Sequence, residues 1–96
     1  MRSAGYVDDA RVARERARTL AERGLGDAAI RADLERRGVS KELVGRATAS
    51  LEPEGARAAR LVRSLGNEAR AARTLARKGF EPDSIERAIG AIAEEG

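Results

Sequence analysis

A six-residue pattern occurs twice in this chain, and this repetition limits how the chain can fold. Residues 34–39 read LERRGV, and residues 75–80 read LARKGF, 41 positions further on. The same offset joins other apolar residues in pairs: Leu20 with Leu61, Val44 with Ile85, and Leu51 with Ile92. The offset slips to 40 only near Gly26 and Gly66. A period of this size is typical of supersecondary units that stack on one another, so the sequence predicts two copies of one module.

The apolar residues within each copy follow a helical period. They recur three and four positions apart, and the chain has neither an alternating run nor an Asn-Gly or Asp-Gly hairpin turn. We therefore expect an all-α fold of tandem three-helix repeats, with about six helices that form a curved stack of right- or left-handed sense. The expected division is a flexible N-terminus at residues 1–5, one repeat at 6–51, a second at 52–93, and a tail at 94–96.

The first helix is expected from about Asp9 to Arg23, ending at Gly24 in a left-handed conformation. Asp8 and Asp9 are expected to cap its start and to place negative charge near its dipole. Four residues are expected on its inward face: Val12, Ala13, Ala17 and Leu20. Arg16 falls at the edge of this face, where its aliphatic stem can pack while its charged end reaches outward.

Similar signals mark the other five helices. Ser40 and Asn67 are expected as capping residues, and Pro53 and Pro82 as the first residues of helices. Glycines are expected at further helix ends: Gly26, Gly38, Gly66 and Gly79. The apolar residues expected to pack inward are Ile30, Leu34, Leu43, Val44, Ala47, Leu51, Ala58, Leu61, Val62, Leu65, Ala71, Ala72, Leu75, Ala76, Ile85, Ala88, Ile89 and Ile92.

The composition excludes most kinds of catalytic site. The chain has no cysteine and no histidine, so disulfides, thiolate metal sites and the usual nucleophile–base pairs cannot form. The sequence Gly24-Leu25-Gly26 lacks the lysine and the preceding strand of a phosphate loop. No apolar run is long enough for a membrane span or a signal peptide. We therefore expect a cytoplasmic protein that is not an enzyme and that has no cofactor or metal.

Arginine is the residue type that suggests a binding function. There are 17 arginines and two lysines, and the net charge is +3. Between residues 57 and 78 there are seven basic residues and one acid, so positive charge is concentrated there. The candidate residues for binding a partner or DNA form rows on three helices: Arg11, Arg14 and Arg18; Arg57, Arg60 and Arg63; and Arg70, Arg73, Arg77 and Lys78.

These rows allow two interpretations. They are either ordinary solvated helix faces or a docking surface for phosphates or for an acidic protein, since guanidinium groups suit both partners. The chain has only two aromatic residues, Tyr6 and Phe80, and both lie next to helix boundaries, where packing is the expected use. The sequence therefore does not indicate stacking of single-stranded bases, which needs several exposed rings.

A set of residues spread over nearly the whole chain resembles a known family. The set comprises Gly5-Tyr6-Val7-Asp8-Asp9-Ala10-Arg11, then Ala13, Arg18, Gly24, Gly26, Ile30, Leu34 and Gly38-Val39, and finally residues 72–80, ARTLARKGF. It is similar to the RecX family of bacterial regulators of the RecA recombinase. The resemblance implies tandem three-helix repeats that bind the RecA filament on single-stranded DNA. It also implies that the protein mostly inhibits the recombination, ATPase and coprotease activities of RecA, within DNA repair and the SOS response.

This chain departs from the family pattern in two respects. Family members commonly carry a further three-helix repeat before Tyr6, so the chain is expected to be a shortened member or a fragment with two of the usual three repeats. Arg16 stands where the family often has an aromatic residue. Two other functions remain open on the residues alone: a sequence-independent module that binds single-stranded or duplex nucleic acid, and a helical adaptor for another acidic protein.

Overall fold

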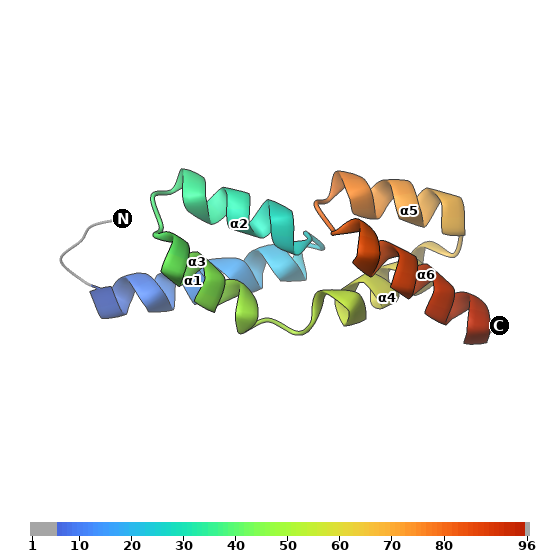
Figure 1. Ribbon diagram of the computed structural model, residues 1–96, viewed down its shortest axis with the longest axis horizontal. Coiled ribbons are helices and arrows are strands. Elements are labelled where there is room, and N and C mark those ends of the chain that lie inside the picture. Colours follow the sequence, from blue (N-terminus) through green and yellow to red (C-terminus); the bar gives the residue numbers. More distant parts are fainter. Residues whose placement is uncertain (1–5, 96) are drawn as a thin grey trace.

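The computed structural model describes residues 6–95, and these form six α-helices in a row (Figure 1). Their bounds are α1 Tyr6–Glu22, α2 Asp27–Arg36, α3 Lys41–Ala49, α4 Glu54–Leu65, α5 Glu68–Arg77 and α6 Pro82–Glu95. The described residues contain no strand. The predicted all-α class with about six helices is therefore confirmed. The predicted N-terminal segment, residues 1–5, lies outside the described residues.

Local chemistry explains most of the helix ends. The side chain of Ser40 accepts a hydrogen bond from the Leu43 amide at 3.3 Å, and Asn67 accepts one from the Arg70 amide at 2.9 Å. Both predicted caps are confirmed. Four glycines that follow helices have a positive φ between 71° and 90°, which side chains rarely adopt: Gly24, Gly38, Gly66 and Gly79. Pro82 begins α6 as predicted.

Three expected boundaries differ from the structure. Helix α1 begins at Tyr6, so Asp9 lies inside its first turn and does not cap it. Pro53 precedes α4, and its carbonyl oxygen accepts hydrogen bonds from the amides of Ala56 and Arg57 at 3.1 and 3.2 Å. Leu51 lies beyond the end of α3 and packs against the core from the linker. In each case the helix start or end moved by a few residues, because several neighbouring residues can serve there.

Each group of three helices packs around its own apolar cluster. In the first group the buried residues are Ala13, Ala17, Leu20, Ile30, Leu34, Val39, Leu43, Val44 and Ala47. In the second they are Ala58, Val62, Ala71, Leu75, Phe80, Ile85 and Ala88. The completely buried alanines allow the helices to approach closely.

Two of the predicted inward residues are exposed. Val12 is 47% exposed, and Ala76 is also exposed. Val12 directly precedes the fully buried Ala13, and Ala76 directly follows the fully buried Leu75. One position turns a helix by about 100°, which carries these side chains past the edge of the narrow buried stripe.

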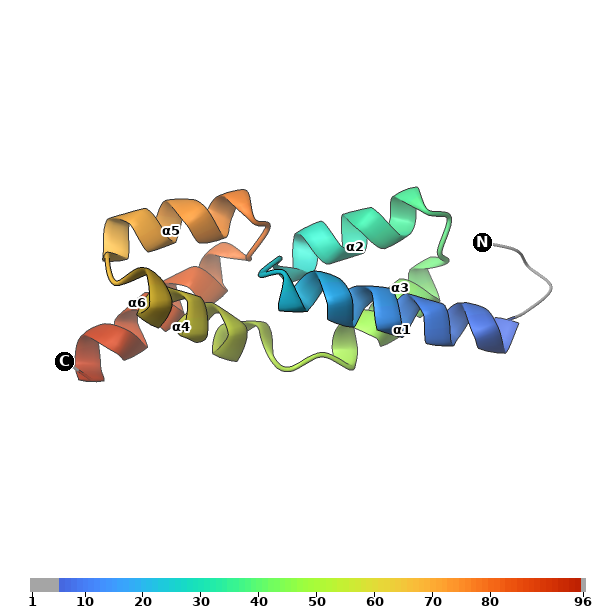
Figure 2. The same cartoon turned by 180° about the vertical axis from the view of Figure 1, so that it is seen from behind.

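The two groups lie end to end and give the molecule an elongated shape of 51 × 19 × 19 Å. Figures 1 and 2 show that α2 and α5 follow one long side of the molecule, whereas the linker from α3 to α4 runs along the opposite side. None of the described helices has the length and apolar character that crossing a membrane requires.

A second connection joins the groups through two corners of backbone. The Gly26 amide donates to the Lys78 carbonyl at 2.9 Å, and the Ala28 amide donates to the Gly79 carbonyl at 3.1 Å. A Cβ atom on Gly26 would lie 2.4 Å from the Phe80 nitrogen. The corner between α1 and α2 thus packs directly against the corner between α5 and α6 (Figure 2). We call this contact the joint.

Candidate basic interaction surface

The structure separates the ten predicted binding residues by environment. Arg57 is buried in the joint, and Arg60 pairs with an acid. Arg11, Arg14 and Arg18 line a groove beside α1. The exposed arginines of α5 form a row along that helix, with Lys78 following its end.

Arg57 was expected on an outward face, and this expectation is wrong because its side chain is only 6% exposed. Its guanidinium group donates to the carbonyl oxygens of Leu25 and Glu52, each at 3.0 Å, and to the carboxylate of Asp27. The same group lies 5.9 Å from the centroid of the Phe80 ring, which places a cation over an aromatic face. Arg57 therefore holds the joint together and is not available to a partner.

Glu54 lies one turn before Arg57 and is the second charged residue of the joint. Its carboxylate is buried and accepts hydrogen bonds from the Asp27 amide at 2.7 Å, the Glu81 amide at 3.3 Å and the Ser84 hydroxyl at 2.6 Å. These donors lie at the beginnings of α2 and α6, where free amides and the helix dipole favour a negative charge. One turn of α4 therefore binds both helix groups.

The remaining arginines of α4 are not free either. Arg60 forms an ion pair with Glu52, with one hydrogen bond of 3.0 Å, and this contact lowers the pKa of the Glu52 carboxyl below its ordinary value. Arg63 is exposed and also has an interaction partner in the structure. Helix α4 therefore does not present a free basic face.

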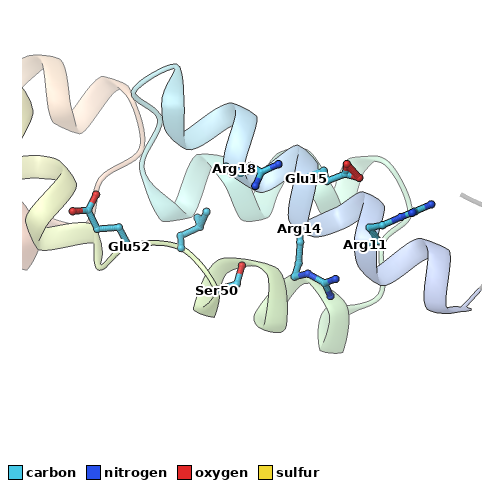
Figure 3. Close-up of a pocket in the computed structure, with 7 residues that line it drawn as sticks. Arg11, Arg14, Glu15, Arg18, Ser50 and Glu52 are labelled. Carbon is cyan, nitrogen blue, oxygen red and sulfur yellow. The ribbon is translucent and has the colours of Figure 1, made fainter.

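The arginines of α1 line a groove of about 420 Å³ between α1 and the linker after α3 (Figure 3). The other lining residues are Glu15, Ser50, Leu51 and Glu52. The side chains of Arg11, Arg14 and Arg18 do not converge on one point (Figure 3), and Arg11 already has an interaction partner. Two carboxylates in the same lining reduce its positive charge, so this groove is a weaker anion site than the arginine count suggests.

The arginines of α5 have a different environment. Arg70, Arg73 and Arg77 are exposed, and their guanidinium groups form no hydrogen bond or ion pair with the side chains that the structure describes. Their spacing of three and four residues places them on one side of the helix, away from the buried Ala71 and Leu75. Lys78 is half-buried, and its carbonyl oxygen belongs to the joint. We call the side that carries the three arginines the α5 face.

Helix α2 is the repeat equivalent of α5 but carries a different charge. It contains two arginines and three acids, whereas α5 contains three arginines and one acid. The acid of α2 that pairs with arginines is Asp33. It accepts two hydrogen bonds of 3.2 Å from Arg16 and one of 2.9 Å from Arg37. The hydrogen bond with Arg16 is the main cause that lowers the pKa of Asp33. At the 41-residue offset, Asp33 corresponds to the uncharged Thr74.

Sequence reasoning missed Glu54 and Asp33. The contacts of Glu54 come from residues 27 to 30 positions away, which no local pattern reveals. The role of Asp33 could have been suspected from an alignment of the two repeats. That alignment places Asp33 opposite the uncharged Thr74 and Arg16 opposite Arg57. Asp33 also provides the partner for the charged end of Arg16, whose side chain is 29% exposed.

Comparison with known proteins identifies the family. The family described as "RecX, second three-helix domain" matches residues 8–47. The chain is also 39% identical, over 95 residues, to a protein named "Regulatory protein RecX" from Stenotrophomonas maltophilia. That alignment covers 88% of this chain and 58% of the relative, so the chain spans little more than half of the relative's length. These two matches and the six-helix fold support assignment of the chain to the RecX family.

Proposed function

We propose that this chain binds the filament that the RecA recombinase forms on single-stranded DNA, and that it inhibits the recombination, ATPase and coprotease activities of RecA in the cytoplasm. Membership of the RecX family supports a regulatory role. We place the binding site on the α5 face, because its three arginines have no acidic partner among the described residues. A filament of acidic protein surfaces and phosphates attracts such a row of guanidinium groups.

The proposed mode of action is binding without catalysis. Among the described residues, no group of three or more acids could hold a metal ion. The joint fixes two three-helix groups into an elongated body of 51 Å. A body of this length can lie along a filament and contact more than one site, which adds binding energy.

The direct test measures the ATPase rate of RecA on single-stranded DNA as the concentration of this chain increases. We expect the rate to fall. An unchanged rate at a large excess of the chain would refute inhibition of RecA by this chain.

Charge reversal tests the site. The variant R70E/R73E/R77E is expected to inhibit RecA much less, because it replaces the row by three carboxylates. A matched control, R23E/K41E/R46E, changes the net charge equally at exposed positions away from α5 and should inhibit as the wild type does. Equal inhibition by the α5 variant and the wild type would remove the α5 face from the site.

A further inference from the structure

We propose that the α5 face binds the phosphate backbone of nucleic acid, and that the uncharged residue at position 74 keeps this face available. The inference deepens the proposed function, since it names DNA as the part of the filament that α5 contacts. It rests on three features of α5: the residues between the arginines, the spacing of the arginines, and the comparison with α2.

The α5 face offers charge to a partner but little apolar area. Stable protein interfaces combine arginine with large apolar or aromatic anchors in their centres. The exposed apolar residues of α5 are Ala69 and Ala76, and the large apolar residue that is exposed in the described chain, Val12, belongs to α1. A surface of arginine and alanine gains its binding energy from charge, which is the way in which proteins bind phosphate backbones irrespective of base sequence.

The spacing of the arginines fits a chain of phosphates. Arg70 and Arg77 are seven residues apart, which corresponds to about 10 Å along a helix. One strand of B-DNA places a phosphate at about every 3.4 Å of its axis, so the row spans about three phosphates. The small side chains between the arginines let a backbone approach the helix. Asn67, a residue type that could read a base edge, already caps α5 with its side-chain oxygen.

Helix α2 shows how the same scaffold becomes unsuitable for phosphates. Asp33 lies within 3.8 Å of Arg36 and within 2.9 Å of Arg37. In the second repeat the equivalent residues are Arg77 and Lys78, and the equivalent of Asp33 is Thr74. Ala29 and Ala32 of α2 correspond to Arg70 and Arg73 of α5. The two repeats thus place a neutralised face on α2 and a basic face on α5.

Thr74 has a second consequence for the arginine of the preceding helix. Asp33 holds Arg16 within the first helix group. The equivalent residue in the second group, Arg57, has no acid at position 74 and extends into the joint. The difference at position 74 therefore agrees with both the unpaired Arg77 and the use of Arg57 in the joint.

The test measures binding of a fluorescently labelled oligonucleotide, single-stranded or duplex, by anisotropy at several salt concentrations. We expect the logarithm of the affinity to fall with the logarithm of salt with a slope of about 2 on the single strand and about 3 on the duplex, from three neutralised phosphates. The variant R70A/R73A/R77A should lose most of this binding and most of the slope.

Position 74 provides the sharper comparison. T74D places a carboxylate three residues before Arg77 and four before Lys78, as Asp33 is placed before Arg36 and Arg37. It should weaken DNA binding about tenfold. T74N, which adds no charge, should bind as the wild type does. Circular dichroism and urea unfolding of both variants verify that they are folded; equal DNA affinity of folded T74D and T74N would overturn the inference.

Parallel measurements of RecA ATPase inhibition separate this inference from the proposed function. If the chain binds DNA through α5 but leaves RecA unaffected, the inference stands and the proposed function fails. If the α5 variants lose inhibition of RecA while their affinity for bare DNA is unchanged, the face binds an acidic protein surface and the inference is wrong.

Discussion

Glu54 is the residue of α4 whose carboxylate connects the beginnings of α2 and α6. Its buried carboxylate accepts hydrogen bonds from two backbone amides and one hydroxyl, and these donors would lose their partner in E54A. Leaving buried donors without a partner costs about 1–3 kcal/mol. We therefore expect E54A to lower the free energy of unfolding by about this amount, measured by urea denaturation. The control E86A removes an exposed carboxylate of α6 and should change stability far less; equal losses in both variants would contradict the role of Glu54.

Asp33 makes the stability of the first helix group depend on pH. Its pKa is lowered in the folded chain, chiefly by the hydrogen bond from Arg16. A carboxyl of this kind stabilises the fold at neutral pH, and its contribution disappears as the pH falls below about 4 and through the folded pKa. We expect D33N to be less stable than the wild type at pH 7 and the difference to shrink toward pH 2. The variant R16Q should show the same convergence, whereas parallel curves for D33N and the wild type would refute this account.

At the scale of single residues, the sequence predicted apolar positions better than charged ones. Ala17, Leu20 and Ile30 are buried as their helical spacing indicates. Arg57 follows the same spacing as an exposed arginine, yet it is buried, because its partners are carbonyl groups and an acid contributed by other segments. A buried charge depends on which distant groups meet it, and a local pattern contains no record of that.

At the scale of elements, a comparison of two glycines with the same backbone conformation distinguishes the effect of backbone strain from the effect of close packing. Gly38 and Gly79 have φ values of +86° and +90°, and each follows the second helix of its group. A Cβ atom on Gly38 would meet nothing within 4 Å, whereas one on Gly79 would lie 2.5 Å from the Cβ of Ala29. Gly79 therefore carries the same dihedral requirement as Gly38 and an additional steric one.

We expect G38A to cost about 1–2 kcal/mol, the strain of a left-handed residue with a side chain. G79A should cost clearly more, because the joint must open to admit the methyl group. Urea unfolding of the two single variants measures the difference. If both losses were equal, the close packing of Gly79 against Ala29 would not contribute to stability.

The helices themselves were largely predictable, because their ends depend on nearby residues. Ser40, Asn67 and Pro82 mark helix starts with their own chemistry, and the glycines mark ends. The start of α1 was less predictable, since Tyr6 and Val7 precede the acids that resemble a cap and yet belong to the helix. The candidate surface shares this limit: the row on α5 follows from helical spacing, but the loss of the row on α4 follows from tertiary contacts.

At the scale of the whole molecule, the radius of gyration is 14.6 Å, compared with about 12.5 Å for a compact domain of this length. The two apolar clusters do not merge into one core. In stacked repeats, the stability of the array is the sum of the stability of each unit and of the interface between units. Here the joint and the linker provide that interface, and we expect the joint to make the two helix groups unfold together.

The variant G26A tests this coupling directly. Gly26 has a φ of −84°, which alanine adopts without strain, so the effect of a methyl group is steric. Its Cβ would lie within 2.5 Å of the backbone of Gly79 and Phe80, and the two corners must separate. We expect G26A to retain its helices by circular dichroism, to unfold in urea over a broader range or in two steps, and to show a larger radius of gyration in X-ray scattering.

G90A is the control, because its Cβ would meet nothing within 4 Å on α6. Alanine favours a helix by about 1 kcal/mol relative to glycine, so G90A should unfold in one step at a higher urea concentration. A single, unbroadened transition for G26A with an unchanged radius would mean that each helix group is placed by the linker alone, and that the elongated body proposed to lie along the filament does not depend on the joint.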